Sequence, residues 1–272
     1  MVKKKNFKLI AEIGWNFLGN LSLAKKMILA AKNSGADFVK FQIWNPDNLK
    51  SGSWDKDGRR EIYKKSFLDE KKFKILSKYS SKKKIGCFAS VFSEKDLSLY
   101  SKITKNVVKV PSHEAYNFKL IKKCIKTFKL VLISCGCLKK RELISLLNLV
   151  ANKKNVVLMH CVSSYPLDEK NCNFEKFYYL KRNFQKVGYS GHLKGINDAL
   201  HAISNGSLYT EKHFTINNKL KGRDNKFAIL PKEMRTLSNY IKNLEDFNIK
   251  RGLDLQKCEK DIFKNYRGRW QK

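Results

Sequence analysis

The chain has 272 residues, 42% of them hydrophobic and 12% aromatic, which is enough for the core of one large domain. Only 4 prolines and 14 glycines, with a mean hydropathy of −0.48, exclude collagen-like and low-complexity proteins. The sequence contains no run of about 18 apolar residues, the length needed to cross a membrane. No apolar run with a cleavage site follows the basic residues 1–5, so the sequence predicts no signal peptide. The sequence therefore predicts a globular, cytoplasmic protein.

The charge balance is strongly positive, with 57 lysines and arginines against 24 aspartates and glutamates and a formal net charge of +33. Such a field attracts anions of any size. Most of the basic residues are lysines scattered from end to end, and they form no arm, basic helix or aromatic-interleaved RNA motif. We therefore favour a solvated lysine-rich surface, which would also attract a small anionic substrate. Nucleic-acid binding is the alternative.

The seven cysteines are an odd number, without a CxxC pair or the spacing of a zinc finger, so we expect reduced and mostly buried thiols. Cys135 and Cys137 alternate where a predicted strand ends. At these two positions we favour small packing residues over a redox-active pair.

Short apolar, β-branched segments alternate with helical segments along the chain, which is typical of βα units. The expected strands are 8–14, 37–42, 85–89, 107–110, 130–134, 155–161, 186–189 and 207–213. The expected helices are 21–34, 69–83, 94–101, 117–127, 139–152, 173–183, 195–205 and 231–246. Eight such pairs predict a (β/α)8 TIM barrel over residues 1–248, followed by a basic tail, 249–272, without a second domain. A doubly wound sheet is the alternative, although the glycines of AEIGWNFLGN have the wrong spacing for a dinucleotide-binding turn.

One connection, residues 43–68, is longer than an ordinary loop and carries Trp44, Trp54, Arg59 and Arg60. We interpret it as a lid over the barrel, with a surface excursion of no further role as the alternative.

Polar residues stand at the end of every predicted strand, where the active sites of TIM barrels are built. Glu12, Lys40 and Lys109 interrupt apolar strands, which is costly unless the charges are paired, so the three favour a polar site over separate structural ion pairs. Two lysines among serine hydroxyls suit a phosphate and a carboxylate. His192 and His213 follow neighbouring strands and can share one divalent cation. The set is Glu12, Asn16, Lys40, Gln42, Ser90, Lys109, Ser112, Glu114, Ser134, Ser163, Tyr165, Ser190, His192, Glu211 and His213.

Eight motifs together carry a resemblance that covers about residues 8–246: AEIGWNFLGN, GADFVKFQIW, VVKVPSHEAYN, LVLISCG, MHCVSSYP, VGYSGHLKG, EKHFT and GRDNKFAILP. The chain resembles the sialic acid synthase family. The resemblance implies a (β/α)8 barrel, usually followed by an antifreeze-like domain. It also implies a transferase that condenses phosphoenolpyruvate with an N-acyl amino-sugar aldehyde, releases phosphate and uses a divalent metal, Mn2+ or Mg2+.

The resemblance also implies roles for individual residues. Phosphoenolpyruvate would be held by Lys109, Ser90, Ser112, Ser134, Ser163 and Ser190, and the metal by His192 and His213. The sugar and the reacting centre would be surrounded by Glu12, Lys40, Gln42, Glu114, Tyr165 and Asp224, with Glu12 or Glu114 activating the attacking water. Of these, Glu12, Lys40 and Glu114 are the expected catalytic residues.

Five positions depart from the family pattern. Gly191 and Leu193 stand where the family has an aspartate and a threonine, which predicts a missing carboxylate and hydroxyl beside the metal. Phe17 stands for a histidine, His113 for a glycine and Arg223 for a proline. We expect all five to lie at the site, where they indicate a variant sugar substrate or, as the alternative, a degenerate barrel that binds a sugar or a partner without turnover. We expect a homodimer assisted by a separate antifreeze-like protein.

Overall fold

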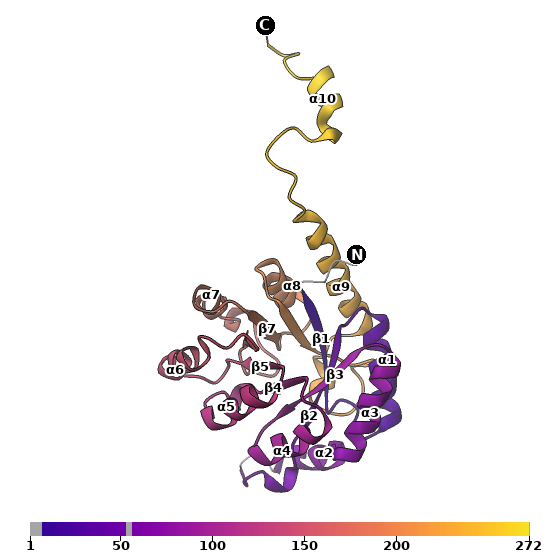
Figure 1. Ribbon diagram of the computed structural model, residues 1–272. Helices are drawn as coiled ribbons and strands as arrows, with labels where there is room; N and C mark the ends of the chain where they lie inside the picture. Colours follow the sequence, from indigo (N-terminus) through magenta and orange to yellow (C-terminus); the bar gives the residue numbers. More distant parts are fainter. Residues whose placement is uncertain (1–6, 53–55, 272) are drawn as a thin grey trace.

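The computed structural model describes residues 7–52 and 56–271, so residues 1–5 and Trp54 lie outside the described residues. Eight parallel strands form a closed barrel in which each strand pairs with the next and β8 (Tyr209–His213) closes onto β1 (Lys8–Gly14) (Figure 1). The predicted TIM barrel is confirmed, and the alternative of an open doubly wound sheet is wrong.

The other strands are β2 (Phe38–Ile43), β3 (Gly86–Val91), β4 (Val107–Val110), β5 (Leu130–Ser134), β6 (Val156–His160) and β7 (Val187–Gly191). The helices are α1 (Leu21–Asn33), α2 (Arg59–Ser66), α3 (Glu70–Lys82), α4 (Glu94–Ile103), α5 (Phe118–Thr127), α6 (Lys140–Val150), α7 (Phe174–Asn183), α8 (Asn197–Ser204), α9 (Pro231–Phe247) and α10 (Lys260–Asn265). All eight predicted strands and all eight predicted helices are present, with ends that differ by a few residues.

Local signals in the sequence explain where the outer helices begin. Asn20, Asp69, Ser93 and Asn117 precede α1, α3, α4 and α5, and each side chain accepts a hydrogen bond from a backbone N–H of the first turn. These caps satisfy donors that the helix itself cannot. Each helix then turns an apolar face to the barrel wall.

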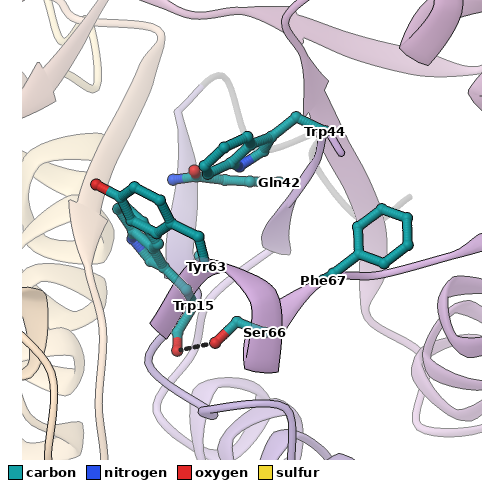
Figure 2. Close-up of a pocket in the computed structure, with 7 residues that line it drawn as sticks. Trp15, Gln42, Trp44, Tyr63, Ser66 and Phe67 are labelled. Carbon is teal, nitrogen blue, oxygen red and sulfur yellow. Dashed lines mark hydrogen bonds between the residues drawn. The ribbon is translucent and has the colours of Figure 1, made fainter. Parts of the chain in front are cut away.

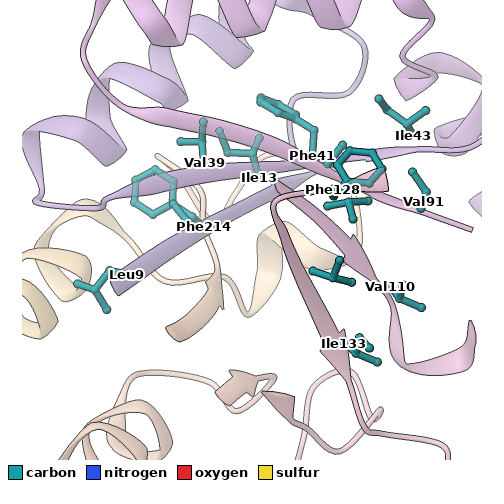
Figure 3. Close-up of a cluster of buried hydrophobic side chains, with 14 of the residues drawn as sticks. Leu9, Ile13, Val39, Phe41, Ile43, Val91, Val110, Phe128, Ile133 and Phe214 are labelled. Atoms are coloured by element: carbon teal, nitrogen blue, oxygen red, sulfur yellow. The ribbon is translucent and has the colours of Figure 1, made fainter. Parts of the chain in front are cut away.

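Strand alternation sorts the side chains into two cores. The inward-facing residues Ile10, Phe88, Leu132, Val157 and Met159 fill the barrel floor. The outward-facing residues pack under the helices in a second, larger core, part of which is shown in Figure 3. Two residues beyond Ile10, Phe88 and Leu132, the same inward face carries Glu12, Ser90 and Ser134, so these polar residues face the barrel mouth.

The long connection after β2 is not structureless. It contains η1 (Pro46–Asn48) and α2, and it packs beside the barrel mouth rather than forming an open excursion. Beyond α9, the tail leads away from the barrel and carries the short helices η6 (Lys257–Glu259) and α10 (Figure 1).

The seven cysteines are free, and most of them are buried or half-buried as expected, whereas Cys137 and Cys258 are exposed. Within residues 7–52 and 56–271, no helix is long and apolar enough to span a membrane.

Candidate active site

Four charged side chains meet inside the barrel, each at most 4% exposed. Lys40 Nζ lies 2.9 Å from Glu12 Oε2 and 3.7 Å from Glu211 Oε1. Lys109 Nζ lies 2.6 Å from the same Glu211 oxygen. The two lysines expected at the site are thus brought together, and two glutamates neutralise them.

Hydroxyl and amide groups surround this cluster. Ser190 Oγ donates to Glu211 Oε1 over 3.1 Å and accepts from Lys109 over 3.2 Å, and Gln42 Nε2 donates to Glu12 Oε1 over 2.8 Å. Ser112 Oγ and Ser163 Oγ are 2.7 Å apart. The inward-facing hydroxyls of Ser90 and Ser134, 1% and 3% exposed, complete the expected set of serines.

Glu211 is the residue that sequence reasoning left without a role, although it was among the polar strand-end residues. The signal that could have identified it is its parity: it lies two positions before His213 on β8 and therefore shares the inward face. Its Oε1 accepts from Lys109 and Ser190, while its Oε2 is buried with no hydrogen-bond partner among the described residues.

Burial and neighbouring charge shift the pKa values of this cluster in different directions. Burial alone lowers the pKa of Lys40, but Glu12 and Glu211 together outweigh it and leave that pKa raised. Burial also lowers the pKa of Lys109, and here one carboxylate, opposed by the charge of Lys40, does not compensate. Burial raises the pKa of Glu211, yet the two lysines bring it down to about 2. Glu211 is therefore an anion throughout the physiological range, and Lys109 is the cation more easily discharged.

The two expected metal ligands lie side by side at the mouth, with ring centroids 5.6 Å apart. His192 Nδ1 donates to the Val162 carbonyl over 2.7 Å, because a carbonyl oxygen can only accept, so Nε2 carries the free lone pair. Burial and the neighbouring His213 lower the pKa of His192 to about 3, so the ring is neutral at pH 7. Nδ1 of His213 is buried without a hydrogen-bond partner among the described residues.

This donor set fits an open cation site rather than a closed one. Neutral imidazole nitrogens are ligands for Mn2+ and Mg2+ only in company with oxygen donors. The described part of the chain contains no group of three or more histidine, cysteine, aspartate or glutamate side chains able to hold a metal, so water or substrate oxygens would have to complete the coordination. Asp224 Oδ2, 3.7 Å from His213 Nδ1, is the nearest carboxylate oxygen to that ring.

Asp224 and Tyr165 join the histidine side of the mouth. Trp15 Nε1 donates to Asp224 Oδ2 over 2.5 Å, and the Tyr165 ring lies 4.2 Å from the His192 ring. The departure at Arg223 has a structural consequence, since its guanidinium donates to the Tyr165 carbonyl over 2.7 Å. The sugar side of the expected site is thus assembled from four different loops.

The connection between β2 and α3, together with the end of β1, lines a narrow pocket beside this mouth (Figure 2). Tyr63 of α2 stacks on Trp15 at 4.0 Å between ring centroids, and Trp44 meets the Tyr63 ring edge-on at 4.8 Å. Burial raises the pKa of Tyr63 to about 12, so the phenol stays neutral. Gln42 lines the same pocket and connects it to the Glu12 carboxylate.

Glu114, an expected catalytic residue, and the departures His113 and Phe17 make their contacts with other residues. Glu114 is half-buried, accepts a hydrogen bond from Asn117 over 3.3 Å, and has a pKa raised by burial. His113 packs its ring against Phe92 at 5.3 Å. Phe17 is 1% exposed and packs against Phe41 in the outer core, so the expectation that this departure lies at the site is wrong. An aromatic side chain in that position follows the outer core, not the mouth.

Comparison with known proteins agrees with this arrangement. The model of the NeuB family matches residues 27–250. The chain is 33% identical over 258 residues to N,N'-diacetyllegionaminic acid synthase of Campylobacter jejuni, covering 89% of this chain and 77% of that protein. It is 32% identical to N-acetylneuraminate-9-phosphate synthase of Drosophila melanogaster, covering 87% of this chain and 68% of that protein.

Solved structures point the same way. The N-acetylneuraminic acid synthetase of Leptospira borgpetersenii, in complex with citrate, superposes with a TM-score of 0.85 at 29% identity and covers 95% of this chain and 91% of that chain. A DAHP synthase of Thermotoga maritima, at 15% identity, a TM-score of 0.68 and coverage of 89% of this chain and 69% of that chain, shares the fold alone. Because the family model spans most of its length, the chain belongs to the NeuB family.

Proposed function

We propose that this protein condenses phosphoenolpyruvate with an N-acyl amino-sugar aldehyde to form a nonulosonic acid and phosphate. The observation that carries the proposal is the position of two buried lysines, several serine hydroxyls and two histidines in one barrel mouth. The relatives are named as synthases of N,N'-diacetyllegionaminic acid, N-acetylneuraminate-9-phosphate and pseudaminic acid. These names support the same class of reaction.

Lys40 and Lys109 would bind the phosphate and the carboxylate of phosphoenolpyruvate. Both ammonium groups now contact Glu211, so an arriving anion competes with a carboxylate for the same donors. The hydroxyls of Ser90, Ser112, Ser134, Ser163 and Ser190 would supply the further donors that a phosphate requires.

Glu12 would act as the base for water. Its Oε2 is buried 2.9 Å from Lys40 Nζ, and a carboxylate oxygen that contacts one ammonium group keeps a further lone pair for a proton. The enol carbon of phosphoenolpyruvate forms a bond to the aldehyde carbon, and the aldehyde oxygen takes up a proton. Water adds to the neighbouring carbon, and Glu12 takes one of its protons, which balances the proton gained by the aldehyde oxygen. The carbon–oxygen bond to phosphate then breaks, the second water proton leaves with the phosphate, and the added oxygen becomes the keto group. Glu114 stays the alternative base, although its carboxylate lies with Asn117.

His192 and His213 would hold the divalent cation, Mn2+ or Mg2+, with Asp224 close to His213. When bound, the cation would supply Lewis-acid polarisation of the aldehyde oxygen. Tyr165, packed on His192, and Gln42, bonded to Glu12, would orient the sugar.

A degenerate barrel that binds a sugar without turnover is the second candidate. This candidate is favoured because the described residues contain no group of three or more histidine, cysteine, aspartate or glutamate side chains able to hold a metal ion. A sugar-binding barrel would retain the mouth and its lysines but form no product.

The barrel unit of residues 1–248 would work as a homodimer assisted by a separate antifreeze-like protein. The support is the exposed apolar surface of the tail, where Leu253, Tyr266 and Trp270 project from the chain. Gel filtration of the full chain, and of the chain trimmed after Asn248, tests whether the tail contributes to assembly.

The experiment that tests the activity is a phosphate-release assay on the purified chain with Mn2+ and phosphoenolpyruvate. N-acetylmannosamine and its diacetamido relatives serve as sugars, and the His213→Ala protein serves as the control. Phosphate release that depends on one sugar supports the synthase. Binding of the sugars by a folded protein that releases no phosphate supports the degenerate barrel.

A further inference from the structure

A buried ion pair lies behind the barrel wall, outside the mouth. Lys212 faces outward from β8, and Asp198 reaches it from the first turn of α8, with side chains 2% and 0% exposed. Lys212 Nζ lies 3.0 and 2.9 Å from the two Asp198 oxygens and donates to the Leu193 carbonyl over 2.7 Å. Tyr189 donates its hydroxyl to Asp198 Oδ2 over 3.0 Å. Every polar group of the pair is therefore satisfied.

Gly191 faces the same network. It pairs in register with Lys212 across β7 and β8. A Cβ atom at 191 would lie 2.3 Å from Asp198 Oδ2 and 2.6 Å from Tyr189 Cε1, so the Asp198 carboxylate fills the space of a side chain at this position. A side chain at position 191 would therefore lie in the layer between the strands and the helices. The expectation that glycine at this position removes a carboxylate from beside the metal is wrong.

The network joins β8, which ends in His213, to β7, which ends at Gly191 just before His192. Gly191 and Leu193 flank His192, and Lys212 directly precedes His213. The Lys212 bond to the Leu193 carbonyl fixes the backbone just after His192, and the Leu167 amide fixes the His192 carbonyl over 3.0 Å. A loosened Lys212 would release the ends of β7 and β8 together.

We propose that Asp198 is a positioning residue: its carboxylate, carried by α8, fills the space of a side chain at position 191, pairs with Lys212, and fixes His192 and His213 from behind. The same geometry implies an exchange, in which a carboxylate placed at position 191 takes over the ion pair with Lys212 when Asp198 is removed. The role of Asp198 toward the cation rests on the function proposed above, whereas the exchange of carboxylates does not.

Thermal unfolding of three variants tests the exchange. Asp198→Ala leaves Lys212 buried without a counterion, and we expect its unfolding midpoint to fall by about 5–10 °C. Gly191→Asp alone places two carboxylates in one space and also lowers the midpoint. The double variant Gly191→Asp with Asp198→Ala is expected to recover at least half of the loss. The matched control, Gly191→Asn with Asp198→Ala, offers the same shape without the charge and is expected to recover less.

The exchange would be overturned if the unfolding midpoint of the aspartate double variant fell by the sum of the drops in the two single variants. It would also be overturned if the asparagine control recovered as much of the midpoint as the aspartate double variant. If Asp198→Ala fails to fold, soluble yield replaces the midpoint. Folded protein from the aspartate double variant alone then supports the exchange, and its absence contradicts it.

Mn2+ binding, measured by electron paramagnetic resonance on the folded proteins, tests the positioning role separately from activity. Asp198→Asn is expected to weaken Mn2+ binding about tenfold, and the aspartate double variant to restore it. Unchanged affinity in Asp198→Asn would overturn the positioning role. A wild-type chain that binds no Mn2+ would contradict both that role and the proposed metal site, while the unfolding data would still decide the exchange.

Discussion

Lys109 and Glu211, 102 positions apart in the chain, lie 2.6 Å from each other inside the barrel. Both belong to the inward face, Lys109 on β4 and Glu211 on β8, so only closure of the barrel brings them together. Glu211 is therefore the counterion that neutralises the Lys109 ammonium group at the barrel mouth. Under the proposed function, the anionic substrate would replace Glu211 as the counterion of Lys109.

Replacing Lys109 is expected to impair phosphoenolpyruvate binding most. Lys109→Ala removes a buried donor to phosphate or carboxylate, and the KM for phosphoenolpyruvate should rise by about 100-fold while the sugar KM changes little. Steady-state kinetics in both substrates measure this. Lys119→Ala, a surface lysine 75% exposed at its side chain, is the control. Equal, small effects on both KM values would mean that Lys109 is structural.

Replacing Lys40 is expected to act on turnover instead. Lys40 contacts Glu12, the proposed base, at 2.9 Å, so Lys40→Ala should lower kcat about 100-fold because the carboxylate loses its counterion and its orientation. An unchanged kcat would remove Lys40 from the reacting centre.

Glu211→Gln should change the pH dependence of substrate binding. Glu211 raises the pKa of Lys109 against the lowering effect of burial, so its neutralisation should lower that pKa further. Lys109 then loses its proton at a lower pH, and the KM for phosphoenolpyruvate should begin to rise at a lower pH than in the wild-type protein. The measurement is KM between pH 6 and pH 10. A rise that begins at the same pH in both proteins contradicts the coupling.

The lid should limit access of water to the mouth. Tyr63→Ala removes the ring that stacks on Trp15 at 4.0 Å, and we expect more phosphate to be released than sugar acid formed, because the intermediate meets bulk water. Tyr63→Phe keeps the ring and should preserve a ratio of one. Parallel assays of phosphate and sugar acid give the ratio. Coupled release in Tyr63→Ala would mean that α2 is not a lid.

His160 should make stability depend on pH. It is fully buried, and burial lowers its pKa to about 4, below the value of about 6.5 in the unfolded chain. Below pH 6.5 the unfolded state binds a proton that the folded state does not, so stability falls as the pH drops from 6.5 towards 4. At pH 5 the loss from this residue is about 2 kcal/mol.

Urea unfolding at pH 7 and pH 5 checks this dependence. The His160→Gln variant should lose less stability between the two pH values than the wild-type protein. His201→Gln, at an exposed histidine, is the control and should follow the wild type. Identical losses in the His160 variant and the wild type would show that this histidine is not the source.

The barrel and much of its mouth could be predicted because strand alternation is written in the sequence. Ile10 and Glu12 share a face, as do Phe88 and Ser90, so an apolar floor and a polar mouth follow from period-two spacing. The partner of each charge could not be predicted, because Lys109 and Glu211 meet only across the closed barrel.

Other features depend on tertiary contacts that local patterns do not carry. The helix α2 has the charged sequence RREIYKKS, and its Tyr63 packs on Trp15 and Trp44, which come from the ends of two other segments of the chain. From the sequence, Gly191 indicated a missing carboxylate beside the metal. In the structure, Asp198 of α8 fills the space that a side chain at position 191 would occupy. The position of a polar side chain, in the mouth or in the outer layer, depends on its strand face and its tertiary neighbours and not on its residue type.

The fate of the bridging oxygen of phosphoenolpyruvate tests the central claim most directly. The purified chain is given Mn2+, an accepted amino-sugar and phosphoenolpyruvate labelled with 18O between carbon and phosphorus. The condensation proposed for this mouth breaks the carbon–oxygen bond, so the label should appear in the released phosphate and one sugar acid should form per phosphate. Label retained in a pyruvate product, or phosphate released without a sugar acid, would contradict the account.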